Sequence, residues 1–192
     1  MDRETGDRNI LDKFAEDFCN VADKHVKYIV VSGFVAISHG RNRGTIDIDM
    51  IIEKISFDKF KRFHEDLVKA GFECLQSSKA EDIYDYLNKG ASVRYVREGR
   101  YLPPEMDIKF AKDELDLFQL VHRKKIPLSG MDIWFSDIET NIAFKEELLK
   151  DNKDIEDAQH LRIIYKEEIN EKYIKEIKRM IKKLRLREKN ER

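Results

Sequence analysis

The sequence predicts an α/β fold of the α+β type, in which helices flank a mixed β-sheet and a helical region follows. Short apolar or alternating runs of strand length are separated by longer runs with apolar residues at helical spacing. From Asp113 onward the helical spacing predominates. The 192 residues are enough for one well-formed core. We therefore expect a sheet-containing domain over residues 1–135 and a helical region over residues 136–192 that packs on it.

The sheet-containing part is expected to alternate between helices and strands. An amphipathic helix over Asn9–Lys24 precedes a buried strand over Tyr28–Val31, and a short apolar helix follows Ser32 and Gly33. The other expected elements are a strand over Thr45–Ile52, a helix from the Ser56 cap to about Ala70, a short strand over Phe72–Gln76, a weaker helix over Lys79–Leu87, and strands over Ser92–Val96 and Met106–Phe110.

The carboxy-terminal elements are expected to be mostly helical. They are a helix over Asp113–His122, a final strand over Met131–Phe135 with Trp134 in the core, a helix from a Ser136–Glu139 capping box to Leu149, a helix that begins at Lys153, and a last helix over Glu168–Arg187. The last helix has one apolar and one basic face. We expect the apolar face to dock on the domain, and contact between the basic face and RNA is the alternative.

Composition excludes several classes of protein. The 37 basic and 38 acidic residues nearly cancel, which argues against a wholly basic surface for nucleic acid but leaves room for a local patch. Cys19 and Cys74 are far apart and have no zinc-ligand spacing, which fits a reducing cytoplasm. Neither a signal peptide nor an apolar run near the roughly 20 residues of a membrane helix is visible. We expect a soluble, cytoplasmic protein with no membrane partner.

Two aspartates on the strand over Thr45–Ile52 give the first chemical signal. Because side chains on a strand alternate between faces, Asp47 and Asp49 point to one face while Ile48 and Met50 point to the other. Like charges held side by side repel, and carboxylates at this spacing suit Mg²⁺ or Mn²⁺. Taken alone, an Asp-x-Asp pair is equally consistent with a solvated edge strand.

Residues that precede this strand have phosphate-binding chemistry. Gly33 allows a tight turn and close approach to a ligand at a helix start, and Ser32 can cap that helix or hydrogen-bond a phosphate oxygen. Arg43 and Thr45 lie just before the carboxylates, where a guanidinium group binds phosphate in a bidentate way.

The same loop contains two residues with less specific patterns. Arg41 is expected to be an ordinary exposed charge. His39 is expected to hydrogen-bond locally and is a candidate only for lining the site.

Competing motifs fail on spacing, because there is no Gly-x-x-x-x-Gly-Lys-Ser/Thr P-loop and the aspartate pair lacks the third ligand and glycine of a calcium loop. A metal-dependent glycosyltransferase, which also uses Asp-x-Asp, needs a larger donor-binding domain.

The combination resembles a known signature. A strand followed by Ser32-Gly33, Ala36, Gly40, Arg43, Thr45, Asp47 and Asp49 is similar to the signature of the nucleotidyltransferase superfamily related to DNA polymerase beta. Within it, the match is best to the small AbiE-type (AbiEii-like) minimal nucleotidyltransferases of prokaryotes. The turn of that family reads Gly-Gly or Gly-Ser, so Ser32 departs from the pattern. The resemblance implies a nucleotidyltransferase fold with a carboxylate-bound Mg²⁺ or Mn²⁺.

The resemblance also implies roles for individual residues. A third carboxylate of the family comes from a strand beside the Asp-x-Asp strand, and Asp107 matches it, so that Asp47, Asp49 and Asp107 would be catalytic metal ligands. The implied nucleotide-binding residues are Ser32, Gly33, Arg43, Thr45, Lys145, Lys153, Asp154 and Asp157. For the last three of these, a solvated and salt-bridged helix face is the alternative.

The implied reaction is Mg²⁺-dependent transfer of a nucleoside monophosphate from an NTP to a hydroxyl, with release of pyrophosphate. The acceptor would be an RNA or tRNA 3′ end, a protein side chain or a small molecule. By analogy with AbiE-type relatives, a role in a toxin–antitoxin system with an antitoxin partner is a hypothesis. The alternative is a non-catalytic binding or regulatory module with the same fold. Ser32 favours that alternative, and the three aspartates oppose it.

Overall fold

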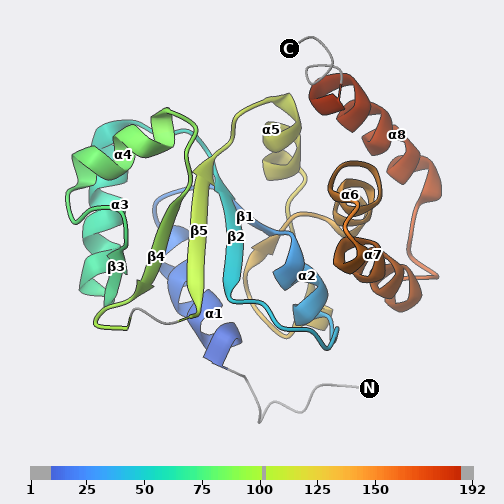
Figure 1. The fold of residues 1–192 in the computed structure, drawn as a ribbon, viewed down its shortest axis with the longest axis horizontal. Coiled ribbons are helices and arrows are strands. Elements are labelled where there is room, and N and C mark those ends of the chain that lie inside the picture. The colour runs from blue at the N-terminus through green and yellow to red at the C-terminus, as the bar shows by residue number, and fades with distance from the viewer. Residues whose placement is uncertain (1–9, 101–102, 187–192) are drawn as a thin grey trace.

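A seven-stranded mixed sheet forms the centre of the computed structural model, which describes residues 10–100 and 103–186. The strand order is β3-β4-β5-β2-β1-β7-β6. Figure 1 shows helices α3 and α4 at the β3 end of this sheet and helices α6, α7 and α8 beyond its other end. This arrangement confirms the predicted class, a mixed sheet flanked by helices.

The order of elements follows the prediction closely. The elements are α1 (Ile10–Ala22), β1 (Tyr28–Val31), α2 (Gly33–Ser38), β2 (Asp47–Ile52), α3 (Phe57–Lys69), β3 (Phe72–Cys74), α4 (Ala80–Asn88), β4 (Val93–Arg97), β5 (Glu105–Phe110), α5 (Glu114–Val121), β6 (Lys124–Lys125), the 3₁₀ turn η1 (Pro127–Ser129), β7 (Trp134–Phe135), α6 (Ile138–Phe144) with its π-helical extension η2 (Lys145–Leu149), α7 (Asn152–Ile164), and α8 (Glu171–Ile181) with the π-helical extension η3 (Lys182–Leu186).

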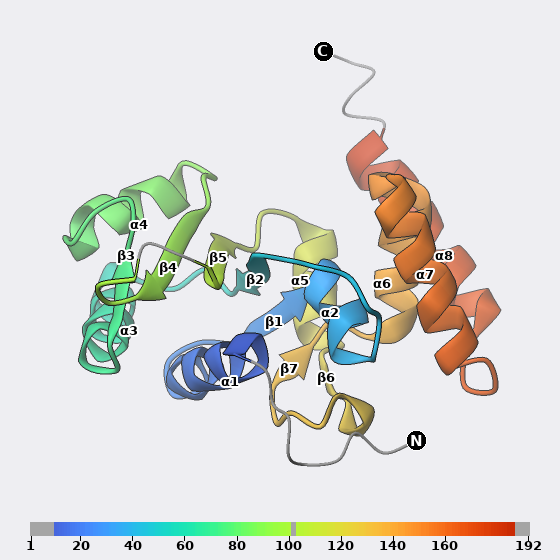
Figure 2. The same ribbon diagram turned by 60° about the horizontal axis from the view of Figure 1, so that its bottom comes forward.

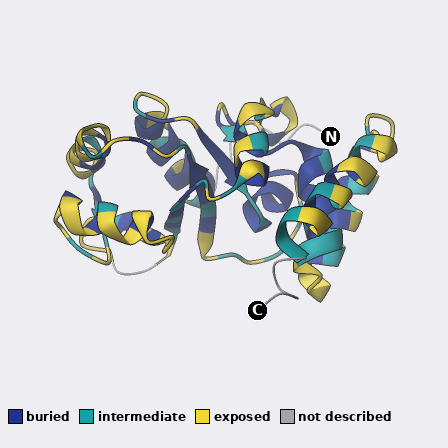
Figure 3. Cartoon of the chain, turned by 90° about the horizontal axis from the view of Figure 1, so that it is seen from above, coloured by how far each residue is buried: buried dark blue, intermediate teal, exposed yellow. Residues whose placement is uncertain are grey.

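The two faces of the sheet differ in what covers them. On one face Ile48 and Met50 of β2 are fully buried in the main core, to which α1, α3 and α4 contribute aromatic and aliphatic side chains. The opposite face has a small second core of Ile29, Ile51 and Leu120, the last from α5. Figure 3 shows the burial concentrated on the strands and on the inward faces of the helices. Because Asp47 and Asp49 alternate with the core residues of β2, they lie on the second face.

Three local expectations were wrong. The strand over Met131–Phe135 is only Trp134–Phe135, paired with the unexpected two-residue strand β6, whose lysines carry no alternating pattern. Trp134 is only partly buried, because its indole donates to Asp23 and the Arg123 guanidinium lies over its ring. The cap of α6 is Asp137 rather than Ser136, since the Asp137 carboxylate accepts from the Thr140 amide.

The carboxy-terminal helices pack together beyond β1 and β7, as Figure 2 also shows. Helix α8 buries Ile174, Ile177 and Ile181 and packs against α6 and η2, so its apolar face is covered by the carboxy-terminal helices. Its docking on the sheet-containing domain stays a prediction. The expected helix limits at Asn9 and Arg187 lie outside the described residues. The division of the chain at residues 135 and 136 stays a prediction. No described helix combines the length and apolar character that crossing a membrane requires.

Candidate functional site

The turn between β1 and α2 contains Ser32 in an unusual backbone conformation. Its φ of 65° and ψ of −135° lie close to a region that is essentially limited to glycine. Holding a side chain in such a region costs about 1–3 kcal/mol. The Ser32 hydroxyl makes no cap to α2, so that expected role was wrong, and it instead hydrogen-bonds Asp49. Ser32 therefore links the turn to the carboxylate strand.

The three predicted carboxylates lie on two neighbouring strands. Asp49 of β2 is the direct register partner of Asp107 of β5, and Asp47 lies two residues before Asp49. Burial raises the pKa of Asp49; the positive charge of Lys109 opposes this, and the negative charges of Asp47 and Asp107 add to it. The Asp107 carboxylate is also 3.7 Å from Nε of Arg94. The three side chains thus form a region of the sheet in which negative charge is concentrated.

The chemistry of this donor set fits a hard divalent cation. Three carboxylates supply oxygen ligands, which Mg²⁺ and Mn²⁺ prefer, and a cation would relieve the repulsion around Asp49. Within residues 10–100 and 103–186, no three His, Cys, Asp or Glu side chains are yet close enough together to hold a metal ion. Binding would therefore require Asp47, Asp49 and Asp107 to turn toward one another.

The Arg43 guanidinium lies directly against Gly33. A Cβ atom added to Gly33 would fall 1.9 Å from Nη2 of Arg43, so this approach requires glycine. Nη2 of Arg43 is also 3.1 Å from Oδ2 of Asp157. Nearby, the Thr45 hydroxyl donates to Oδ1 of Asp47 over 3.0 Å. The turn, the loop and the carboxylate strand therefore contact one another as the motif predicts.

Lys145 lies in a buried ion cluster with two aspartates of α7. Only 1% of Lys145 is exposed, and its Nζ donates to Oδ2 of Asp157 over 2.8 Å and to Oδ1 of Asp154 over 3.2 Å. Asp154 and Asp157 are themselves buried. The solvated helix face offered as their alternative does not describe these two residues, whereas Lys153 is exposed.

Arg41 belongs to the same buried ion cluster. Its Nε donates to Oδ1 of Asp157 over 2.8 Å, and its Nη2 lies 2.5 Å from Oε2 of Glu156. The hydrogen bond that Arg41 donates to Asp157 is the main cause of a raised Arg41 pKa. The expectation of an ordinary exposed charge at Arg41 was wrong. Only the contact across the fold reveals its partner, because the sequence separates Arg41 from Asp157 by 116 residues.

One cavity of about 220 Å³, called here the carboxylate cavity, joins most of these residues. It is lined by Ser32, Gly33, Arg43, Thr45, Asp47, Asp49, Leu149, Asp151, Lys153 and Asp154. Three predicted residues do not line it. Asp107 lies on the adjacent strand β5, and Lys145 and Asp157 lie in the buried ion cluster.

A second cavity of about 180 Å³, called here the amide cavity, adjoins the first and shares Ser32, Asp49 and Leu149 with it. Lys145 lines this space together with Gln119 and Asn141. Neither amide was predicted from the sequence, because single amides on helices belong to no motif. Their one signal is a polar side chain within an otherwise apolar helix face.

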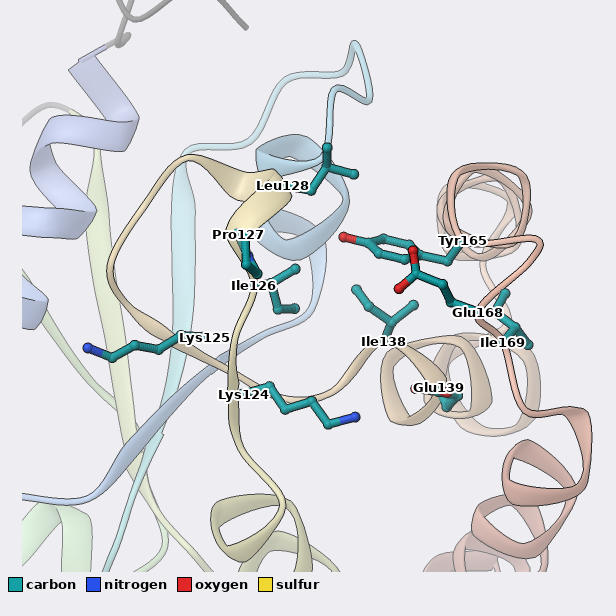
Figure 4. A pocket seen from close by; sticks show the side chains of 10 residues that line it. All are labelled: Lys124, Lys125, Ile126, Pro127, Leu128, Ile138, Glu139, Tyr165, Glu168 and Ile169. Carbon is teal, nitrogen blue, oxygen red and sulfur yellow. The ribbon is translucent and has the colours of Figure 1, made fainter. Parts of the chain in front are cut away.

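A larger cavity, with a volume of about 610 Å³, lies elsewhere, between η1 and the connection from α7 to α8. Figure 4 shows Tyr165 pointing into it opposite Pro127 and Leu128. It shares no lining residue with the carboxylate or amide cavities. Size alone therefore does not identify the site, and we take the smaller cavities as the candidate site because they contain Asp47, Asp49 and the guanidinium group of Arg43.

His39 does not line the carboxylate cavity. It is 4% exposed, and its ring lies 6.0 Å from that of Phe135 and 5.6 Å from that of Tyr165. The expected site-lining role was therefore wrong. His39 is a core residue that packs α2 against β7 and α7.

Comparison with known proteins supports the fold. A solved structure of the antibiotic-resistance factor ANT(2'')-Ia, an aminoglycoside nucleotidyltransferase, is similar with a TM-score of 0.54 and 11% sequence identity. The similarity covers 93% of this chain and 95% of that one. No protein-family model and no curated protein sequence matches the chain. The chain therefore has a nucleotidyltransferase-like fold, and the AbiE-type assignment stays a prediction.

Proposed function

We propose that this chain is a Mg²⁺- or Mn²⁺-dependent nucleotidyltransferase that transfers a nucleoside monophosphate from an NTP to a hydroxyl. The observation that carries the proposal is the carboxylate cavity, whose wall combines Asp47 and Asp49 with Gly33 and Arg43. Carboxylates suit a cation and a guanidinium group suits phosphate, and a cation–triphosphate complex needs both. The nucleotidyltransferase-like fold supports the same reaction class.

In this proposal different residues bind the cation, bind the phosphates and accept the proton. Asp47, Asp49 and Asp107 would hold the cation, which when bound neutralises charge on the triphosphate. Arg43 and the backbone at Gly33 bind the phosphates. Asp107 accepts the proton of the acceptor hydroxyl, whose oxygen forms a bond to the α-phosphorus while the bond from that phosphorus to the bridging oxygen breaks. Pyrophosphate then leaves.

A non-catalytic nucleotide-binding module is the second candidate function, and two observations favour it. The Lys145 ammonium is already bonded to Asp154 and Asp157, so a phosphate must compete with two carboxylates for it. Ser32 also replaces the glycine of the resembling family in a glycine-type conformation. A module of this kind would bind an NTP without transferring the nucleotide.

The proposed acceptor is an RNA, a tRNA or a protein, as the AbiE-type resemblance implies. Exposed Lys172, Lys175 and Arg179 on α8 form a basic surface suited to an RNA acceptor. The structural neighbour acts on aminoglycosides, which makes a small hydroxylated molecule the competing class. A toxin–antitoxin role, with an antitoxin partner, rests on analogy alone.

A labelled-nucleotide assay tests the proposal. Each NTP, labelled either at the α- or at the γ-phosphate, is incubated with Mg²⁺ and with an RNA pool, a protein mixture or aminoglycosides. We expect the α-label to join one acceptor class and the γ-label to leave as pyrophosphate, with both changes absent in the Asp47→Ala/Asp49→Ala variant. Nucleotide binding without transfer to any acceptor would favour the non-catalytic module.

A further inference from the structure

The amide cavity has the size of one part of a nucleotide. Its volume is about 180 Å³, whereas sites that enclose a whole small ligand typically measure about 300–1,000 Å³. It adjoins the carboxylate cavity through the shared residues Ser32, Asp49 and Leu149. A ligand whose phosphates lie in the carboxylate cavity can therefore extend into the amide cavity.

Two buried amide side chains, Gln119 and Asn141, line this cavity, and each is 4% exposed. Both are held by Ser136. The Ser136 hydroxyl donates to Oε1 of Gln119 over 2.9 Å, and the Ser136 carbonyl accepts from Nδ2 of Asn141 over 2.9 Å. Nδ2 of Asn141 also donates to the Asp137 carbonyl. One end of each amide is thus fixed to the protein.

The other ends of these amides are available to a ligand. Among the described residues, neither the amide nitrogen of Gln119 nor the amide oxygen of Asn141 has a hydrogen-bond partner. Neither atom is among the fully buried polar atoms that lack a partner in the described part of the chain, so both reach the open space of the cavity. An accessible donor and an accessible acceptor on one cavity wall can therefore pair with a ligand that presents matching groups.

One part of the remaining wall suits a flat ring, because Ile51, Phe144 and Leu148 supply apolar surface beside the two amides. The other part carries the charged groups of Asp49, Lys109, Asp116, Lys145 and Arg185. Proteins that read a nucleobase combine hydrogen bonds to its Watson–Crick edge with apolar or aromatic contacts to its faces. Each of the four bases presents a donor beside an acceptor on that edge, and the order differs between bases.

We propose that Gln119 and Asn141 read the Watson–Crick edge of the bound nucleotide and so set the base preference of this protein. This inference rests on the proposed function, because it needs the triphosphate in the carboxylate cavity. Adenine and cytosine present an amino donor beside a ring-nitrogen acceptor, and uracil presents one N–H donor between two carbonyl acceptors, whereas guanine presents two adjacent donors, its ring N–H and its amino group. Changing the Gln119 donor to an acceptor leaves two acceptors on this wall and therefore favours guanine.

The test measures the affinities of ATP, CTP, GTP and UTP, with Mg²⁺, for wild type, Gln119→Glu and Gln159→Glu. Gln119→Glu keeps the acceptor for the Ser136 hydroxyl and replaces the open donor. Gln159 is exposed on α7 and introduces the same charge outside the cavity. We expect Gln119→Glu to raise the affinity of GTP relative to ATP, CTP and UTP about tenfold, and Gln159→Glu to leave the ratios unchanged.

A second measurement needs no variant. A triphosphate methylated on the Watson–Crick edge, such as N1-methyl-ATP or N3-methyl-UTP, should bind wild type about tenfold more weakly than its parent. Unchanged ratios in Gln119→Glu together with full binding of the methylated nucleotides would overturn base reading and leave the proposed function standing. Failure of wild type to bind any NTP would overturn the proposed function, and the inference with it.

Discussion

The carboxylates of β2 and β5 and those of α7 all belong to the predicted site, but they differ in their surroundings. Asp157 is fully buried and lies within 3.1 Å of cationic nitrogens from Lys145, Arg41 and Arg43. Asp49, by contrast, lies beside two further aspartates, and the pKa of Asp49 is raised. Each carboxylate of the buried ion cluster has a cation in hydrogen-bond contact, whereas the positive charges of Lys109 and Arg94 beside the carboxylate strands do not offset the raised pKa of Asp49.

Because their surroundings differ, the two groups of carboxylates should contribute differently to the stability of the fold and to nucleotide binding. Removing one member of a buried ion pair leaves an uncompensated charge and strongly destabilises a protein. Removing one of several like charges on a partly exposed surface relieves repulsion instead. The same type of substitution should therefore have very different effects on unfolding in the two regions, and nucleotide binding should show a different pattern again.

The largest expected contrast is between Asp157→Ala and Asp47→Ala. Asp157→Ala should lower the free energy of unfolding by about 3–5 kcal/mol, because it leaves three buried or partly buried cations without their shared carboxylate. Asp47 is exposed, so Asp47→Ala should change the free energy of unfolding by less than about 0.5 kcal/mol. Urea unfolding followed by circular dichroism measures both. Equal losses in the two variants would remove the distinction between the regions.

Gly33→Ala sharpens the comparison at the point where the two regions meet. The added Cβ would displace the Arg43 guanidinium, which contacts Asp157. We expect about a tenfold loss of NTP affinity, because the phosphate-binding group is moved. Gly44→Ala is the matched control, since nothing lies within 4 Å of a Cβ there. Calorimetric titration checks both variants, and equal NTP affinity in them would contradict the role of Arg43.

Ser32→Gly tests the strain beside the carboxylate strands. Glycine adopts φ 65° and ψ −135° readily, so the variant should gain about 1 kcal/mol in the free energy of unfolding. Lys150→Gly is the control, because φ 63° and ψ 8° lie in the ordinary left-handed helical region and less strain is relieved. Thermal unfolding compares the two, and a smaller gain at Ser32 than at Lys150 would refute the strain.

Asp49→Asn should give the smallest effect, and its sign depends on pH. Because folding raises the pKa of Asp49, the protonated form of this carboxyl stabilises the folded state. This contribution to the free energy of unfolding is fully present only below the ordinary pKa of 3.8, and it is lost as the pH rises through the raised pKa. Asp49→Asn should therefore be more stable than wild type at pH 7, by less than about 1 kcal/mol, and the difference should vanish in acid. Mg²⁺ should stabilise wild type selectively. Unfolding curves at both pH values with and without Mg²⁺ test this, and a less stable variant at pH 7 without Mg²⁺ would contradict it.

Several features of the fold could be predicted because they depend on local pattern. The apolar run over Tyr28–Val31, which ends before a glycine turn, forms a strand with those same limits. The alternation of Asp49 with Ile48 and Met50 places the carboxylate opposite the core, as the two-residue period of a strand requires. The resemblance placed Asp107 on the adjacent strand, where it is the register partner of Asp49.

Other features depend on contacts that the local pattern does not contain. Lys145 is buried because η2, which contains it, contacts α7. Arg41 is paired because the loop between α2 and β2, which contains it, also contacts α7. Asp137 caps α6 because its carboxylate accepts from the Thr140 amide, whereas the Ser136 hydroxyl donates to Gln119 in the amide cavity. The turn between β1 and α2 sets the positive φ of Ser32. A serine does not itself predict that conformation, and the one indication was the glycine that the resembling family has at this position.

The most direct test of the central claim is calorimetric titration of wild type and Asp47→Ala/Asp49→Ala with each NTP, in the presence and absence of Mg²⁺. If the carboxylates of β2 and β5 bind a cation–triphosphate complex, wild type should bind at least one NTP in a Mg²⁺-dependent way, and the double variant should lose that dependence. NTP binding that is equally strong without Mg²⁺, or that survives in the double variant, would contradict the account.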